Sequence, residues 1–438
     1  MGTNCPANKS HTSHNRTGPV SKIHRFLTVK SIAKAYTRAG FSAGNKPSPM
    51  RSILIVLDSL GIGAAPDADR YGDWGADTLG HIFAQTPELA LPALFSLGLG
   101  EVLAGGRHEV QGIRASYGRM RVASPGKDSM TGHWEMAGVL VKEPFTVYER
   151  LPPQLIEAIE ADAKVEFLGR DGRGGNGDLW LEHAATGRPM LHLAPGDSAL
   201  EIAAHESLLP RRRLYEISRV ARRHADSHRI ARVIAQPLAG KPAGYKPAPG
   251  RHEYALIPPR TVLNAISETG LVVEGIGKIP DLFARSGVTH GHHAATNPET
   301  YQAIERVWER MPDGLLFANL PDFDRYGHGR DIPAYALALS QFDQWLAGFV
   351  PKVGRDDLLI ITADHGNDPA FRGSDHTREE VPLLVHYDGV TGPLNTRETL
   401  ADIAATLGEY FRLKDRWSTG HSFLHFKHQR ASHVPARK

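Results

Sequence analysis

Five short, mostly apolar runs indicate buried β-strands in this chain. They span residues 53–57, 272–276, 315–319, 358–362 and 382–386. Runs of this length without alternation of apolar and polar positions are typical of parallel strands covered on both faces of a sheet. We therefore predict that all five are parallel strands of one central sheet.

Helical patterns lie between these runs. Asp331 and Pro333 provide an N-cap and an N1 proline, and apolar residues then recur at helical spacing at Tyr335, Leu339, Phe342 and Leu346. A second helix is predicted over residues 301–310, with Ile304, Val307, Trp308 and Met311 on one face. Strands that alternate with helices predict a layered α/β domain.

The segment of residues 144–258 has a different composition. It contains a glycine-rich stretch at 169–177, the arginine run 211–213 and a stretch rich in proline and glycine at 237–250. We predict that it is a smaller α/β domain inserted into a core of residues 50–143 and 259–425. The arginine run is interpreted as a solvated face.

The composition describes a globular chain without disulfides. Of 438 residues, 41% are hydrophobic and 23% charged, which excludes collagen, coiled coil and disorder throughout. Cys5 is the only cysteine, so an internal disulfide and a thiolate metal cluster are excluded and a cytoplasmic location is expected. No apolar run approaches the roughly 18 residues of a membrane span, so no membrane association is expected.

The basic excess lies in an N-terminal leader, residues 1–49. Residues 1–51 contain nine Lys or Arg and no Asp or Glu, whereas the remaining chain holds 42 basic and 48 acidic residues. A nucleic-acid partner is therefore not expected, unless the leader itself binds one. The leader is either an organellar transit peptide or a disordered extension before a start at Met50. Residues 426–438 form a short basic tail.

Metal-ligating residue types follow three of the predicted strands. Asp58 follows the first run, Asp322 and Asp324 follow the run near 315–320, and Asp364 and His365 follow the run near 358–363. Because ligands of open α/β sheets bind at the carboxyl ends of strands, we expect these side chains to converge. His328 and His376 lie nearby in the sequence and complete the set.

Asp oxygens and His nitrogens without sulfur suit Mn²⁺, Zn²⁺ or Mg²⁺. Seven candidate ligands are too many for one ion, so we predict two divalent ions roughly 3.5–4 Å apart, an arrangement typical of phosphoryl chemistry. A single Asp after a strand is more often a helix cap or a loop former. The metal site is favoured by the coincidence of three strand ends, two spaced histidines and a hydroxyl-bearing loop in one chain. His290, His292 and His293 follow none of the predicted strands and are interpreted as surface histidines.

A candidate nucleophile lies in residues 126–135, Gly-Lys-Asp-Ser-Met-Thr-Gly-His-Trp-Glu. A serine or threonine at a glycine-bounded turn accepts a phosphoryl group if a metal activates its hydroxyl and a helix N-terminus stabilises the oxyanion. Ser129 and Thr131 both satisfy this condition. A plain N-capping hydroxyl is the alternative.

Five motifs of this sequence resemble those of the phosphopentomutases of the alkaline phosphatase superfamily. The motifs that carry the resemblance are residues 57–67, 75–81, 126–135, 362–369 and 375–379. The likeness extends through 197–206, 232–237, 251–256 and 276–281, and covers roughly residues 50–424, including the predicted insertion.

The resemblance implies a core fold like that of alkaline phosphatase, with the insertion as a cap domain and two ions that are typically Mn²⁺. It assigns Asp58, Asp364 and His365 to one ion and Asp324, His328 and His376 to the other, and makes Ser129 the phosphorylated residue. Asp197 would contact the sugar, while Arg232 and Lys278 would contact phosphate. The implied partners are pentose 1- and 5-phosphates, with a sugar bisphosphate as activator.

Three departures from the family pattern stand out. Ser129 replaces a threonine, which preserves the hydroxyl. The spacing from Asp324 to His328 is one residue shorter than usual and is similar to that of cofactor-independent phosphoglycerate mutase. Residues 194–197 lack the small-residue pattern expected before Asp197.

The same residues are also compatible with other functions. One is a different metal-dependent mutase or phosphatase, and another is a phosphosugar sensor without turnover. A sulfatase is disfavoured, because the core contains neither cysteine nor a Ser-x-Pro-x-Arg motif. The sequence does not indicate the metal's identity, the preferred pentose or the oligomeric state.

Overall fold

A computed structural model describes residues 50–103, 112–170, 172, 177–193, 197–415 and 417–424. The predicted leader and basic tail lie outside these residues. None of the described helices is long and apolar enough to cross a membrane.

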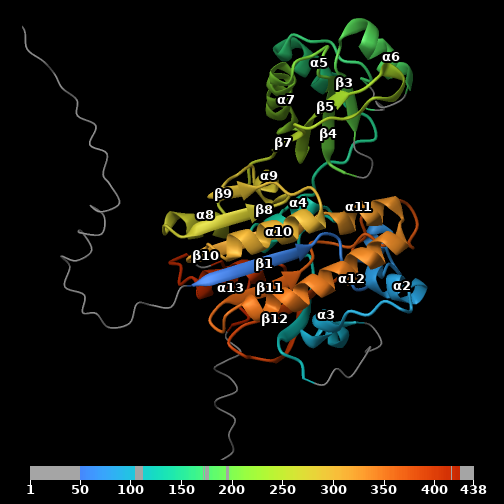
Figure 1. Cartoon of the computed structure of the whole chain (residues 1–438). Coiled ribbons are helices and arrows are strands. Elements are labelled where there is room, and N and C mark those ends of the chain that lie inside the picture. Colours follow the sequence, from blue (N-terminus) through green and yellow to red (C-terminus); the bar gives the residue numbers. More distant parts are fainter. Residues whose placement is uncertain are drawn as a thin grey trace, which may run out of the picture. The chain divides into compact units, whose positions relative to one another are not determined.

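The core is an eight-stranded, mostly parallel sheet between two layers of helices (Figure 1). The order of its strands is β13 (Gly392–Arg397), β2 (Ser116–Met120), β12 (Val381–His386), β11 (Leu358–Thr362), β1 (Arg51–Leu57), β10 (Gly314–Leu320), β8 (Val272–Ile276) and β9 (His290–His292). The expected α/β class with a mostly parallel sheet is confirmed. Strands β1, β10 and β11 are buried throughout except at Arg51, as their continuous apolar sequences predict.

The prediction that all five apolar runs are parallel is wrong for β12. It pairs antiparallel with both β11 and β2. Strand β12 is antiparallel because the loop after β11 reverses the direction of the chain. As a result, β12 begins at the end of the sheet where β11 finishes. An apolar run is buried equally well in either direction, so its pattern does not indicate strand direction.

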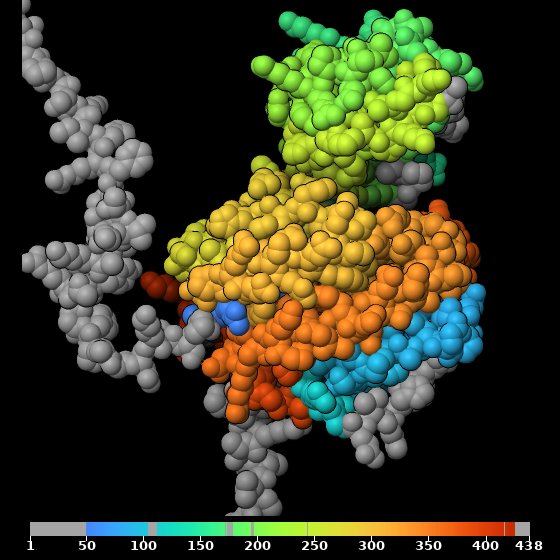
Figure 2. All heavy atoms as spheres, viewed as in Figure 1, coloured from blue at the N-terminus to red at the C-terminus, as the bar shows by residue number. Residues whose placement is uncertain are grey.

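Helices cover both faces of this sheet. On one face lie α2 (Thr78–Gln85), α3 (Pro92–Ser96), α10 (Asn297–Trp308), α11 (Asp322–Gly329) and α12 (Ile332–Phe349). On the other lie α4 (Ser129–Met136), α8 (Val262–Glu268), α9 (Ile279–Leu282) and α13 (Asp402–Tyr410). Helices α10 and α12 form the orange and amber surface of Figure 2.

Helix α12 begins as its sequence predicts. The Asp331 carboxylate accepts a hydrogen bond from Ala334 N at 3.0 Å, which caps the helix. Pro333 occupies the second helical position rather than the first. The four apolar residues predicted for its inner face are fully buried.

A second, five-stranded sheet forms from residues within the predicted insertion. It consists of β3 (Met190–Leu193), β4 (Ala199–His205), β5 (Arg232–Ala239), β6 (Lys246–Pro247) and β7 (His252–Ala255). Helices α5 (Pro153–Ala163) and α7 (Arg211–Ala225) share an apolar core with it, and α6 (Gly177–Thr186) contributes to a smaller cluster. The sheet therefore has cores of its own.

Candidate metal centre

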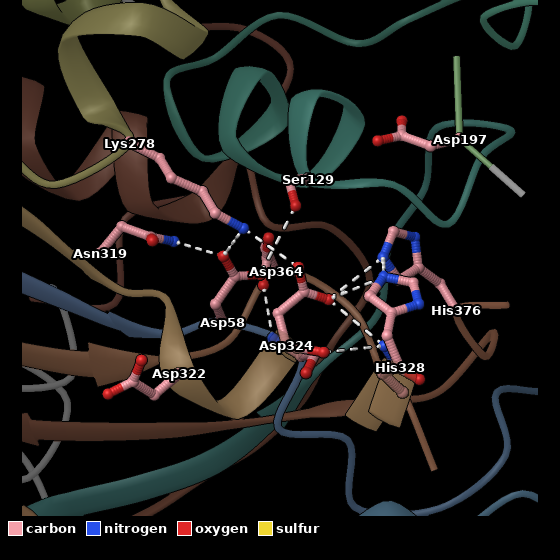
Figure 3. Close-up of polar contacts among 12 residues, drawn as sticks. Asp58, Ser129, Asp197, Lys278, Asn319, Asp322, Asp324, His328, Asp364 and His376 are labelled. Atoms are coloured by element: carbon pink, nitrogen blue, oxygen red, sulfur yellow. Dashed lines mark hydrogen bonds and ion pairs between the residues drawn. The ribbon is translucent and has the colours of Figure 1, made fainter. Parts of the chain in front are cut away.

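The carboxyl ends of three neighbouring strands deliver the predicted ligands to one edge of the central sheet (Figure 3). Asp58 follows β1, Asp364 follows β11, and Asp324 lies in α11 directly after β10. These strands are adjacent in the order β11, β1, β10, which brings carboxylates more than 260 positions apart in sequence into one cluster.

The first group of ligand atoms belongs to Asp58, Asp364 and His365. One atom from each residue lies within 4.8 Å of the other two, and all three residues are buried. His365 Nε2 lies 3.2 Å from Asp364 Oδ2 and 3.6 Å from Asp58 Oδ1. The backbone N–H of Ser59 donates to Asp364 Oδ1 at 3.0 Å, which fixes the carboxylate at the end of β11.

The second group contains Asp324, His328 and His376. Asp324 Oδ1 lies 3.3 Å from His328 Nε2 and 3.2 Å from His376 Nε2, and these two nitrogens are 2.9 Å apart. The short spacing from Asp324 to His328 is one helical turn on α11, so both side chains face the site. Asp324 and His376 also lie within 4.8 Å of His365, which therefore joins both groups.

The Ser129 hydroxyl faces the first group from the start of α4. Its Oγ lies 3.2 Å from His365 Nε2 and 3.5 Å from Asp58 Oδ1. Thr131 instead donates its hydroxyl to Asp128 Oδ2 at 2.6 Å, within the N-cap of the same helix. The geometry thus distinguishes two hydroxyls that the sequence leaves equivalent.

Lys278 lies between the two groups. Its Nζ donates to Asp58 Oδ2 at 2.7 Å and to Asp324 Oδ2 at 3.0 Å. Burial lowers the pKa of Lys278, but Asp324 and Asp58 outweigh this effect and raise it above its ordinary value. Burial and the neighbouring Asp364 raise the pKa of Asp58, because its negative charge is desolvated beside another.

The buried carboxylates and histidines fit divalent cations. Asp364 Oδ2 is buried and lies 3.2 Å from the nearest nitrogens of His133 and His365 without accepting a well-aligned hydrogen bond, so it retains lone pairs for a cation. Burial opposes the charge on His365, yet the nearby Asp364 raises the pKa of this imidazole to about 10. A donor set of carboxylate oxygens and imidazole nitrogens matches Mn²⁺, Zn²⁺ and Mg²⁺, and such ions bind in place of these protons.

Three further predicted residues make contacts of other kinds. Asp322 does not join the cluster, because its Oδ2 accepts from Asn297 N at 2.8 Å and its side chain lies apart from the ligands in Figure 3. Asp197 forms an ion pair with Arg232 on the second sheet. Arg232 also donates to Glu253 Oε2 at 3.0 Å.

The structure adds two residues that are not predicted from the sequence. Asn319 Nδ2 donates to Asp58 Oδ2 at 3.0 Å, and the signal for it was a polar residue inside the apolar run of β10. His133 is fully buried, with Nδ1 2.7 Å from Ser129 O and 3.2 Å from Asp364 Oδ2. It stands in the motif of the candidate nucleophile, one helical turn after Ser129.

Comparisons with known proteins relate this chain to metalloenzymes and phosphopentomutases. A family model described as the metalloenzyme superfamily matches residues 50–415. A phosphopentomutase of Symbiobacterium thermophilum is 42% identical over 370 residues, which cover 82% of this chain and 94% of the relative. A phosphopentomutase of Anaeromyxobacter dehalogenans is 41% identical over 388 residues, covering 85% and 97% respectively.

Two solved structures that match this chain are less similar in sequence. A phosphoglycerate mutase of Leishmania mexicana matches with a TM-score of 0.44 and 13% identity, covering 86% of this chain and 97% of that one. An alkaline phosphatase of the Antarctic bacterium TAB5 matches with a TM-score of 0.33 and 10% identity, covering 84% and 99%.

Proposed function

The chain belongs to the phosphopentomutases of the metalloenzyme superfamily, and from this premise we propose that it interconverts pentose 1- and 5-phosphates through a phosphorylated Ser129. The substrates are ribose and deoxyribose phosphates. The observation that carries the proposal is the Ser129 hydroxyl, which faces both His365 and Asp58 from the N-terminus of α4.

Two divalent ions, Mn²⁺ by preference, complete the proposed site. Asp58, Asp364 and His365 would hold one ion, and Asp324, His328 and His376 the other. When bound, such ions neutralise charge on a transferring phosphoryl group and lower the pKa of a nearby hydroxyl.

Helix α4 prepares Ser129 for phosphoryl transfer. Its free N–H groups and dipole favour an anion at Ser129, the first residue of the helix. The Thr131 hydroxyl donates to the N-cap residue Asp128, whereas the Ser129 hydroxyl contacts Asp58 and His365, so Ser129 is the hydroxyl of this motif that faces the site. His133 holds the backbone of Ser129 from the next turn.

The reaction consists of two phosphoryl transfers. A sugar hydroxyl of the pentose monophosphate attacks the phosphorus of phosphoserine while the bond from that phosphorus to the Ser129 oxygen breaks. The products are a pentose bisphosphate and Ser129, whose oxygen keeps the electron pair of the broken bond and takes up the proton that the sugar hydroxyl loses. The bisphosphate reorients and returns its other phosphoryl group to Ser129. The product is the isomeric monophosphate, and a sugar bisphosphate primes unphosphorylated enzyme.

Cations at the site would hold the phosphate that is not transferring. Arg232 and Lys278 take this role in the proposal, and Asp197 contacts the sugar. Lys278 contacts Asp58 and Asp324, so it turns to a phosphate once another cation balances these carboxylates. Residues 144–258 would act as a cap domain that excludes water while the bisphosphate reorients. We place this chemistry in the cytoplasm.

Substitution of Ser129 tests the proposal. Ser129→Ala should reduce formation of ribose 5-phosphate from ribose 1-phosphate at least about 10³-fold, because no acceptor oxygen remains. Ser129→Thr retains a hydroxyl and should keep turnover within about tenfold. Both variants are assayed with Mn²⁺ and a sugar bisphosphate.

Two results would contradict the mechanism. Full mutase turnover by Ser129→Ala would show that another group accepts the phosphoryl. Release of inorganic phosphate in place of the isomer by the wild-type chain would instead indicate a phosphatase. Assaying isomer and free phosphate in the same sample separates these outcomes.

A further inference from the structure

A histidine pair at the far edge of the central sheet is unused by the proposed reaction. His290 and His292 form the ends of β9, which is the edge strand beside β8 (Figure 1). From the sequence they are interpreted as surface histidines, and their side chains are indeed 58% and 36% exposed. Both imidazoles nevertheless contact the same carboxylate, that of Glu274.

Both imidazoles bond to one carboxylate on the neighbouring strand. His290 Nδ1 lies 2.9 Å from Glu274 Oε1, and His292 Nε2 lies 2.7 Å from Glu274 Oε2. The strands are parallel, with Glu274 opposite His290 and Ile276 opposite His292. Residues two apart in a strand share a face, so the three side chains are on the same face of the sheet edge.

We propose that Glu274, His290 and His292 form a second metal site that binds Zn²⁺ or a similar first-row divalent ion. Two imidazole nitrogens and one carboxylate are a frequent ligand set for zinc, with a fourth position left open. Here each imidazole bonds to a different carboxylate oxygen. As they stand, the three ligand atoms do not all lie within 4.8 Å of one another, so the exposed His290 imidazole must turn for one ion to contact all three residues.

The open position would face a cavity. A hollow of about 380 Å³ is lined by residues of this sheet edge and of α10, and Glu274, His290 and His292 are among them. Arg306 and Arg310 also line the hollow, and their charges favour an anion such as chloride as the remaining ligand. The Glu274 carboxylate, 13% exposed, supplies the negative charge that attracts the cation.

This site is separate from the candidate metal centre. The residues of that centre follow the strand ends of β1, β10 and β11, whereas Glu274 is in the middle of β8 and the histidines belong to β9. Loss of His290 and His292 should therefore leave mutase turnover unchanged.

Zinc stoichiometry tests the proposal. Zinc bound per chain is measured by equilibrium dialysis in a chloride buffer on the full-length, tag-free protein loaded with Mn²⁺. The variant His290→Ala/His292→Ala should bind one zinc fewer than the wild type, even if zinc also displaces Mn²⁺ elsewhere. The control His293→Ala changes the exposed histidine that follows β9, and it should bind as much zinc as the wild type.

A second variant guards against a change of fold. Glu274→Gln keeps the hydrogen-bonding shape but removes the charge, and should weaken binding of this zinc about tenfold or more. Unfolding temperatures without zinc should agree among the variants. Equal zinc in the wild type and the double variant would overturn the proposal, as would loss of the same zinc in His293→Ala. Glu274 would then be only a hydrogen-bonded clamp between β8 and β9.

Discussion

Glu253 is a nearly buried carboxylate between two arginines of the second sheet. Its side chain is 9% exposed and forms ion pairs with Arg232 and Arg251. Burial opposes its charge, but the two arginines outweigh burial and lower the pKa of Glu253 to about 2. A group whose pKa is lowered on folding stabilises the fold above its unfolded pKa, and that stabilisation disappears as the pH falls toward its folded pKa.

We expect Glu253→Gln to lower the free energy of unfolding by about 3 kcal/mol at pH 7. The difference from the wild type should shrink as the pH falls below about 4.5, because the wild-type carboxylate then loses its charge. Urea denaturation at pH 7, 5 and 3 measures it.

Glu268 provides the matched control. It pairs with Arg260 at the surface, where the two side chains are 58% and 48% exposed. Glu268→Gln should change the free energy of unfolding by less than about 1 kcal/mol at any of these pH values. Equal effects of the two substitutions would show that burial between the arginines is unimportant.

At the scale of residues, the sequence predicted that the candidate ligands converge, but not how the neighbouring side chains contact them. Asp58, Asp324 and Asp364 could be predicted to converge because parallel strands end at one sheet edge. Lys278 lies just after β8, and its side chain reaches two of these carboxylates. No rule based on sequence spacing predicts this contact, because it depends on how the side chains pack. The contacts of Asn319 with Asp58 and of His133 with Asp364 were not predictable for the same reason.

Helix α4 approaches the end of β11 so closely that only glycine fits at one position. A Cβ atom on Gly132 would lie 2.5 Å from the backbone oxygen of Asp364. Gly132→Ala should therefore push α4 away from β11 and move Ser129 relative to Asp58 and His365. We expect turnover to fall about 100-fold, since small displacements of reacting groups have effects of this size.

A second helical glycine separates this contact from helix propensity. Gly348 lies in α12 and is exposed, and a Cβ atom there would meet no described residue outside its own helical turn within 4 Å. Gly348→Ala should leave turnover unchanged and raise the free energy of unfolding by about 0.5–1 kcal/mol. Similar turnover in Gly132→Ala and the wild type would contradict the role assigned to the close approach.

At the scale of elements, position and type were more predictable than direction. The apolar runs of β1, β8, β10, β11 and β12 and the cap of α12 were recognisable from local sequence. The reversal of β12 was not, because it depends on the path of the loop after β11. Because of that reversal, one loop carries both Asp364 and His365, where it leaves β11, and His376, shortly before it enters β12.

The molecule as a whole should depend on divalent ions for stability as well as for catalysis. Asp58, Asp324 and Asp364 crowd together, and ions that bind the native site alone stabilise the folded state. Dialysis against a chelator should abolish turnover and lower the unfolding temperature by about 5 °C. Added Mn²⁺ should restore both.

Calorimetry and activity of the same samples check this expectation. The variant Asp324→Asn should show a smaller chelator effect than the wild type, because one ion site is already weakened. An unfolding temperature that does not respond to the chelator in the wild type would contradict it.

The central position of β1 also has a consequence for how the chain folds during synthesis. Ser52 in β1 bonds to Leu358, 306 positions further along, and the other neighbour of β1 is β10, which starts at Gly314. During synthesis, β1 therefore leaves the ribosome long before either of its partner strands, β10 and β11, has been made. Such long-range pairing forms slowly, and until it forms the unpaired apolar strand is exposed and prone to aggregation. Nascent chains that stop before residue 314 should accordingly require chaperones to stay in solution.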